Sequence, residues 1–286
     1  MADTIKIRLE DIYEPVTEER ISEEKEWTLL RNENAALLVS IIQLFLQDAA
    51  RTLTQIAYRY NCKPEDFQFA QNKELREEVA KVMDELEGNI MAQVEEYALN
   101  WREDREDRKD LLLPWLLSLS SVGDKDLRAT LTRRLRQFLF DTEAQIAAMM
   151  LAGYKRTKAT DRVISTMHAV YVSPEMMAAF KRKSAAIYVN TRGVHKGNKG
   201  LAESGATNVE SFAYQTAVIG WARSHYEDYK EWGAAGFYVL RGSNYHCSFC
   251  DSFVGFHTID DFKAMPPFHN HCCCYTVPVY RKEEQK

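Results

Sequence analysis

Four residues near the end of the chain have the types and spacing of a metal site. Cys247 and Cys250 are separated by two residues, and after an interval of eighteen residues His269 and Cys272 repeat that spacing. A tight turn between two cysteines spaced in this way directs both thiolates towards one ion. Together the two pairs supply four sulfur and nitrogen ligands, the number that a closed tetrahedral Zn²⁺ site uses. We therefore predict a structural zinc site at these four residues.

Either of two cysteines could be the fourth ligand of this site. The segment HCCC places Cys272, Cys273 and Cys274 in succession. Because adjacent side chains of an extended segment point to opposite faces, Cys272 and Cys274 share a face and Cys273 opposes them. We predict Cys272 as the ligand, with Cys274 as its substitute. The remaining cysteine and histidines of the region could also replace a ligand: Cys273, His246, His257 and His271.

The same thiols have other possible uses. Five of the six cysteines lie within 28 residues, and Cys62 is the sixth. Free thiols are common in protein cores, but simple packing does not account for such a concentration. A disulfide between the two halves is a further alternative. The N-terminal residues lack the features of a secretory signal, so we expect a reducing cytosol, where clustered Cys and His more often hold a metal.

A catalytic use of the cluster needs groups that the sequence does not supply. A zinc deaminase requires H-x-E before P-C-x-x-C. His225 and Glu227 have the H-x-E spacing, but His246 rather than proline precedes Cys247, so the chain has no P-C-x-x-C. A catalytic zinc keeps three protein ligands and a water, whereas this region offers more than four ligands. A hydrolase or transferase that depends on Cys and His is the alternative function, but no residue singles out one thiol as its nucleophile. We predict that the protein is not an enzyme.

Length and composition indicate a folded protein with an uneven distribution of charge. A chain of 286 residues with 45% hydrophobic side chains can bury a substantial core. The longest apolar stretch, residues 35–46, is shorter than the roughly 20 residues of a membrane-spanning helix, so we predict no membrane segment. The net charge is −5, and the first 28 residues carry nine acidic against four basic side chains.

These patterns divide the chain into four parts. Residues 1–27 are predicted to form an acidic N-terminal arm with at most short structure. Residues 28–153 are predicted to form a body of long helices. Residues 154–206 are a basic, Gly-rich connector region, and residues 207–286 form a small C-terminal module. The predicted fold is therefore a mainly α body with long helices, followed by a small α+β module closed by the Cys/His metal site.

Hydrophobic periodicity defines the helices of the body. Apolar residues recur at steps of three and four from Leu75 to Trp101, which is the spacing of one helix face. A second long helix is predicted from Asp124 to about Tyr154. Pro114 is expected to separate the two, because proline removes a backbone donor and interrupts helices.

The C-terminal module reads as a helix followed by strands. The sequence TNVE at residues 207–210 has the pattern of a capping box, and the helix that it begins is predicted to end near Gly233. The segment GFYVLRGS has the composition of a strand and leads directly towards Cys247. A final strand is predicted at residues 275–280. Large aliphatic residues are few here, so metal–thiolate bonds would replace the missing core as a source of folding free energy.

The order helix, strand, CSFCDSFVGF and PPFHNHCCCYTVPV resembles the C-terminal signature of the phage Mu F-like head morphogenesis proteins, also called minor head or minor capsid proteins. The resemblance covers residues 207–280, a quarter of the chain. The family pattern is C-x2-C, a Gly-containing turn, P-P-x-H-P-N-C-R-C and an apolar strand. The residues that fall on it are Cys247, Cys250, Gly255, Pro266, Pro267, His269, Cys272 and Cys274. This chain departs from it with Asn270, His271 and Cys273 in place of Pro, Asn and Arg.

The resemblance implies a minor virion protein that acts in prohead assembly. Its implied partners are the portal protein and the major capsid or scaffolding proteins. Its implied location is the capsid interior near the portal, after assembly in the host cytoplasm. A phage or prophage origin and a role in DNA packaging or ejection belong to the same expectation.

The basic connector region bears on contact with packaged DNA. Between residues 154 and 200 the chain has ten Lys/Arg against two acidic residues. Such side chains can neutralise phosphates of double-stranded DNA without reading its sequence. An ordinary solvated surface, or a patch that fits an acidic portal or capsid face, is the alternative interpretation. The candidate DNA-binding residues are Lys181, Arg182, Lys183, Arg192, Lys196 and Lys199.

Overall fold

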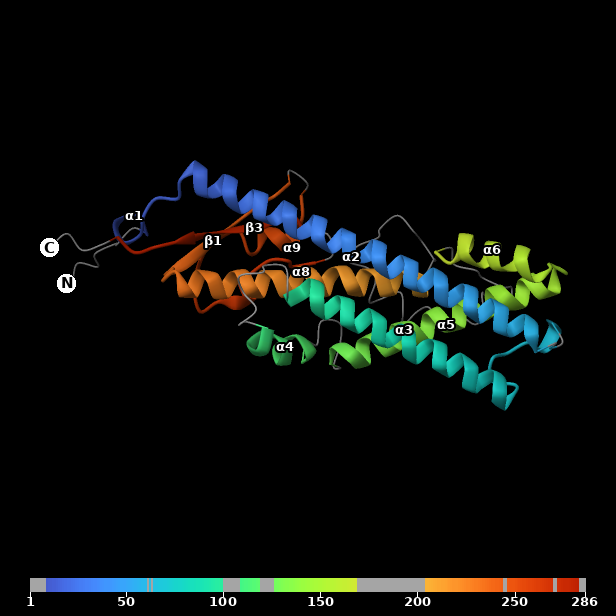
Figure 1. The fold of residues 1–286 in the computed structure, drawn as a ribbon. Coiled ribbons are helices and arrows are strands. Elements are labelled where there is room, and N and C mark those ends of the chain that lie inside the picture. Colours follow the sequence, from blue (N-terminus) through green and yellow to red (C-terminus); the bar gives the residue numbers. More distant parts are fainter. Residues whose placement is uncertain are drawn as a thin grey trace, which may run out of the picture. The chain divides into compact units, whose positions relative to one another are not determined.

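The computed structural model describes residues 9–60, 62, 64–99, 109–118, 126–168, 204–243, 246–269 and 272–282. It is mostly helical, with a small antiparallel sheet near the C-terminus (Figure 1). The fold-class prediction is confirmed. The elements are α1 (Leu9–Ile12), α2 (Glu18–Arg59), η1 (Pro64–Asp66), α3 (Lys73–Leu99), α4 (Lys109–Leu117), α5 (Leu127–Leu151), α6 (Arg156–Thr166), α8 (Gly205–Glu231), β1 (Gly236–Leu240), α9 (Ser248–Asp251), β2 (Gly255–Thr258), η3 (Phe262–Ala264) and β3 (Tyr275–Val279).

The chain forms two compact units. Unit 1 consists of residues 1–39, 93–118 and 213–286, and unit 2 of residues 40–92 and 119–212. The long helices α2, α3 and α8 each contribute residues to both units. The predicted metal ligands all belong to unit 1, so this unit contains the candidate site.

Helix α2 begins within the segment for which we expected at most short structure. Its first residue is Glu18, and the Thr17 side chain accepts a hydrogen bond from the backbone N–H of Arg20. Glu18 and Glu19 occupy the first turn, where negative charge favourably meets the helix dipole. Some of the acidic residues that we assigned to an N-terminal arm therefore lie in the first turn of α2.

The two predicted body helices are confirmed as α3 and α5. In unit 2, Leu75, Val79 and Leu86 are buried along one face of α3. The side chain of Asp126 accepts a hydrogen bond from Ala129 N and begins α5 in the same unit, and its buried face includes Leu131. Pro114 lies between the two helices in the sequence, as predicted. Pro114 lies inside a short helix, α4, in unit 1.

The position of Pro114 inside α4 has a packing explanation. Proline removes one backbone hydrogen bond from the interior of a helix. Leu112 and Leu116 lie one turn apart on α4, and both are buried. Burying two leucine side chains contributes a few kcal/mol, about the size of the proline penalty.

Helix α8 begins earlier than the capping-box pattern predicted. Its first residue is Gly205, and the Ser204 side chain accepts a hydrogen bond from Thr207 N. Glu210, which we expected to cap the helix, instead lies 2.5 Å from His168 Nε2. The helix ends as predicted, because Gly233 has a φ of +74°, a conformation that glycine adopts without a steric penalty.

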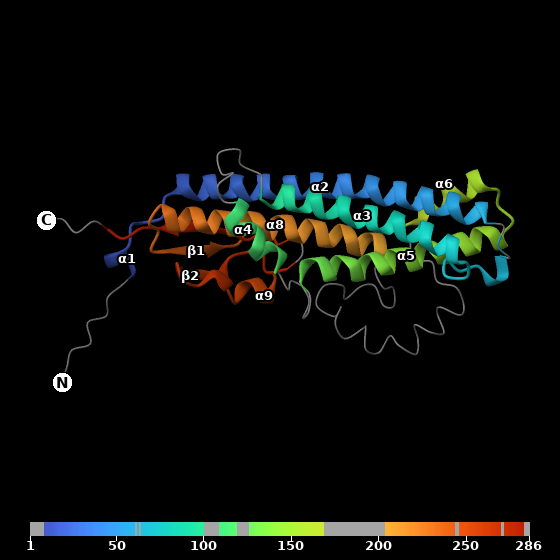
Figure 2. The same cartoon turned by 60° about the horizontal axis from the view of Figure 1, so that its bottom comes forward.

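Three short antiparallel strands form the sheet of unit 1, in the order β2-β1-β3. Strands β1 and β3 match predictions, whereas β2 was not predicted. Phe237 on β1 pairs with His257 on one side and Pro278 on the other. The sheet packs against the C-terminal part of α8, where the Tyr229 hydroxyl donates to the backbone oxygen of Thr276 at 3.0 Å (Figure 2).

Helix α2 is long and apolar enough to cross a membrane, judged by its length and composition alone. Within the described residues, one 18-residue window has a mean hydropathy of 1.3, and 33% of that window is buried inside the protein. This is weak evidence, since core helices of soluble proteins pass the same test. The expectation that the chain has no membrane segment stays a prediction.

Candidate metal centre

Helix α9 places the first two cysteines on one turn. Cys247 precedes the helix and Cys250 lies within it, and the backbone oxygen of Cys247 accepts a hydrogen bond from Asp251 N at 2.9 Å. This bond closes a single helical turn, which brings the two thiols to the same side. Gly242 precedes this turn, and a Cβ at Gly242 would lie 1.6 Å from the backbone oxygen of Cys273. Glycine here lets the two cysteine segments approach each other.

A second turn presents the other two predicted ligands. The backbone oxygen of His269 accepts a hydrogen bond from Cys272 N at 3.2 Å. The turn follows η3 and the adjacent residues Pro266 and Pro267, whose peptide bond is cis. Cys272 then leads into β3, so its position is fixed by the sheet on one side and by the turn on the other.

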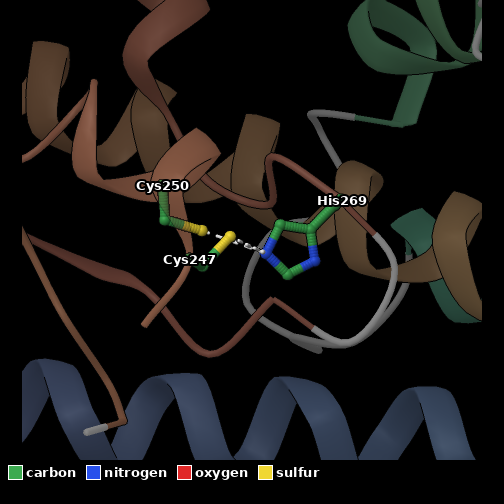
Figure 3. Close-up of side chains that lie close together, drawn as sticks. All are labelled: Cys247, Cys250 and His269. Carbon is green, nitrogen blue, oxygen red and sulfur yellow. Dashed lines mark hydrogen bonds between the residues drawn. The ribbon is translucent and has the colours of Figure 1, made fainter. Parts of the chain in front are cut away.

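The four predicted side chains converge. The His269 Nε2 lies 3.0 Å from the sulfur of Cys250 and 3.4 Å from that of Cys247 (Figure 3). The sulfurs of Cys250 and Cys272 are 3.9 Å apart. In a tetrahedral zinc site, bond lengths of about 2.3 Å to sulfur and 2.0 Å to nitrogen place two sulfurs about 3.8 Å apart and a sulfur about 3.5 Å from a nitrogen. Two of the three distances agree closely with this geometry.

The ligand atoms form two overlapping groups that could each hold a metal ion. Cys247, Cys250 and His269 make one group, and Cys250, Cys272 and Cys274 make the other. Within each group the ligand atoms lie within 4.8 Å of one another. Cys250 belongs to both. The structure therefore places three predicted ligands in the first group, and it places Cys272 and its named substitute, Cys274, beside Cys250 in the second.

The other candidate ligands lie elsewhere or have different partners. Cys273 is exposed. The Nδ1 of His246 lies 3.0 Å from Asp251, and the two ring nitrogens of His257 contact Asp261 and the backbone oxygen of Phe253. His271 lies outside the described residues. Of the eight candidate side chains that the structure describes, five belong to the two ligand groups.

Burial and hydrogen bonding shift the pKa values of these thiols in opposite directions. A hydrogen bond with the Cys274 side chain lowers the pKa of Cys272 to about 5, against the opposing effect of burial. The same bond, followed by burial, raises the pKa of Cys274 far above its ordinary value. Burial raises the pKa of Cys250 to about 12, whereas the backbone N–H of Cys250 lowers the pKa of Cys247. Without a metal ion these thiols do not all ionise together, because adjacent thiolates repel one another.

The surroundings of the cluster are those of a closed site. Cys250, Cys272 and Cys274 are each 3% exposed or less. The rings of Phe253 and Phe268 stack beside them with centroids 4.3 Å apart. A metal held here would be screened from solvent on the side of these thiols.

Two arginines that the motif analysis did not identify contact the backbone of the site. Arg241 donates to the backbone oxygen of Cys247 at 3.1 Å and to Asp251. Arg31 on α2 donates to the backbone oxygen of Cys272 at 3.5 Å. Both contacts join the ligand turns to other parts of unit 1. Arg31 lies 241 residues before its acceptor, so periodicity and motif spacing could not reveal it.

The predicted DNA-binding residues lie outside the described part of the chain: Lys181, Arg182, Lys183, Arg192, Lys196 and Lys199. No family model, curated protein or solved structure matches the chain. The resemblance to Mu F-like head proteins therefore rests on the motif residues alone, and a role in head assembly is a proposal.

Proposed function

We propose that the chain is a phage minor head protein whose C-terminal module is closed by a structural Zn²⁺ ion. The observation that supports the zinc part is the pair of ligand groups that share Cys250, one with Cys247 and His269 and the other with Cys272 and Cys274. Thiolate and imidazole ligands favour zinc among the common divalent ions. Cys272 is the fourth ligand in this proposal.

The structural role follows from how the ligands are distributed. The two ligand turns are separated in sequence by β2 and η3, so one ion would fix both ends of that segment. Metal binding of this kind contributes directly to folding free energy. A hydrolase or transferase would instead need an accessible thiol of lowered pKa. Cys272 has a lowered pKa but is 3% exposed, so the half-buried Cys247, whose pKa is also lowered, is the thiol that such an enzyme would use.

The head-assembly part of the proposal rests on the motif resemblance. The long helices α2, α3 and α8 offer extended surfaces for contacts with the proposed portal, capsid or scaffolding partners. The basic connector region would meet phosphates of packaged DNA. The proposed location is the capsid interior near the portal.

Metal analysis tests the zinc part. Protein purified without chelator should contain about one equivalent of zinc, the content of a single tetrahedral site. Its clustered thiols should react with a thiol reagent slowly until a chelator is added. Less than about half an equivalent, together with free reaction of every thiol in the native protein, contradicts the zinc proposal.

Particle analysis tests the head-assembly part. The chain should copurify with filled heads of the phage or prophage that encodes it, and it should be retained by the portal protein of that phage in a binding assay. Its absence from purified heads would overturn this part and leave the zinc result unaffected. Binding to duplex DNA should weaken as salt rises, because phosphate contacts release counterions.

A further inference from the structure

Arg31 is a buried cation beside the candidate metal centre. Its side chain lies on α2 and the residue is 7% exposed. It makes two long hydrogen bonds, from Nη2 to the backbone oxygen of Cys272 at 3.5 Å and from Nε to Asn32 Oδ1 at 3.4 Å. In the part of the chain that the structure describes, no carboxylate forms an ion pair with it. A guanidinium group stays protonated in proteins, so a positive charge is buried here.

Such a charge requires an opposite charge nearby. Burying an ion without compensation is strongly unfavourable. The other buried cation of unit 1, His225, lies against Glu24 and Asp228. The side chains that would attract Arg31 when negatively charged are of another kind. They are the side chains of Cys272, Tyr214, Cys273 and Cys274.

The proposed zinc site would carry the missing charge. Three thiolates and one neutral imidazole around Zn²⁺ give a net charge of −1, which is spread over the sulfur atoms. We propose that Arg31 is the counter-charge of this site and a positioning residue for Cys272, so that α2 forms part of the metal centre although it supplies no ligand. This inference rests on the proposed zinc site.

A small cavity next to Arg31 suggests a rival explanation. The cavity has a volume of about 30 Å³, and the buried carboxylate residue Glu24 lines it together with His225 and Arg31. A space of this size holds one or two waters or a small anion. An anion such as chloride could then be the partner of Arg31. The zinc–thiolate site and a cavity anion predict different results. If the zinc–thiolate site is the partner of Arg31, removing the arginine charge should lower zinc affinity, and if an anion is the partner it should not.

Two substitutions separate the charge from the hydrogen bond. Arg31→Gln keeps a donor for the Cys272 carbonyl but has no charge, whereas Arg31→Lys keeps both a donor and the charge. Arg51→Gln is the control, since Arg51 lies on the same helix with a side chain 47% exposed and pairs with Asp48. Zinc affinity of the full chain would be measured by competition with a chromophoric chelator.

We expect Arg31→Gln to weaken zinc binding by about tenfold or more, as loss of groups that support metal ligands commonly does. Arg31→Lys should stay within about threefold of the unsubstituted chain, well inside that range, and Arg51→Gln should be unchanged. Equal binding by Arg31→Gln and the unsubstituted chain overturns the inference. So does an equal loss in the Gln and Lys variants, because geometry rather than charge would then be responsible.

Two further results complete the test. If Arg31→Gln does not fold, Arg31→Lys decides alone, and a tenfold loss of zinc affinity in it overturns the inference. In zinc-free protein, exchanging chloride for gluconate at equal ionic strength should not change the unfolding midpoint. A chloride-specific stabilisation that disappears in Arg31→Gln would assign the cavity anion as the partner instead. If the unsubstituted chain binds no zinc, the proposed function fails and this inference fails with it.

Discussion

The Nε2 of His225 on α8 lies 2.7 Å from a carboxylate oxygen of Glu24 on α2, and its Nδ1 lies 3.6 Å from Asp228. Glu24 and Asp228 are buried, and the His225 side chain is 14% exposed. Burial by itself lowers the pKa of His225, but the two carboxylates outweigh burial and raise it to about 9. A charged histidine therefore links the two helices within unit 1 at neutral pH.

This pair predicts a decline in stability at alkaline pH. The pKa of His225 is higher in the folded protein than the value of 6.5 expected when unfolded, so its contribution is complete below pH 6.5. It is lost as pH rises through about 9. At about 1.4 kcal/mol per pH unit, the contribution is on the order of 3 kcal/mol. Urea unfolding between pH 6 and pH 10 measures it.

Glu24→Gln should reduce this pH dependence, because it removes the closest carboxylate. Glu23→Gln is the matched control, since Glu23 is the exposed neighbour on the same helix. The difference in free energy of unfolding between Glu24→Gln and the unsubstituted chain should shrink from pH 6 to pH 10. A difference that does not vary with pH would mean that His225 is not charged in the folded protein.

The fourth metal ligand can be identified by serine substitution. Cys272→Ser should lose most of its zinc affinity, because the Cys272 sulfur lies 3.9 Å from that of Cys250. Cys274→Ser should retain zinc with a smaller loss, since Cys274 acts on the site through its hydrogen bond to Cys272. Cys273→Ser is the control, because Cys273 is exposed. Bound zinc per chain after gel filtration gives the result.

The opposite ranking of these variants would be equally informative. If Cys274→Ser releases zinc and Cys272→Ser keeps it, Cys274 is the ligand. The ligand set would then be Cys247, Cys250, His269 and Cys274, with Cys272 as a neighbouring thiol.

Removing zinc should loosen the two ligand turns and leave α5 unchanged. The segment from Cys247 to Cys274 has few large aliphatic residues, so the ion supplies much of its folding free energy. Helix α5 belongs to unit 2 and buries its own apolar face. Hydrogen exchange followed by mass spectrometry, with and without a chelator, should show faster exchange in the turns. Equal exchange in both conditions would contradict a structural role for the ion.

Local patterns in the sequence predicted the elements whose structure depends on local residues. Helix α3 follows from the apolar spacing of Leu75, Val79 and Leu86, and β1 follows from its aromatic and β-branched composition. The convergence of Cys247, Cys250 and His269 follows from two turns of standard spacing. In each case a few neighbouring residues contain the information that fixes the structure.

Features that depend on distant partners were missed. Arg31 contacts a residue 241 positions away, and Glu24 one 201 positions away. Glu210 has the spacing of a capping residue, yet it pairs with His168, and Ser204 caps α8. A pattern within a few residues cannot state which partner the folded chain brings close, so these roles required the structure.

Gly205 at the start of α8 yields a stability prediction within unit 2. A Cβ at this position would lie 2.2 Å from the backbone nitrogen of Phe138 on α5, and Gly205 N donates to the Asp141 carboxylate at 2.7 Å. Backbone atoms cannot move aside as a flexible side chain can, so Gly205→Ala should lower the free energy of unfolding by about 2–3 kcal/mol.

Gly88→Ala is the control, because nothing lies within 4 Å of its added Cβ inside α3. Alanine there should stabilise the helix by about 0.5–1 kcal/mol. Urea midpoints of both variants should therefore shift in opposite directions, and a shift in the same direction would contradict the close approach of α8 and α5 at Gly205.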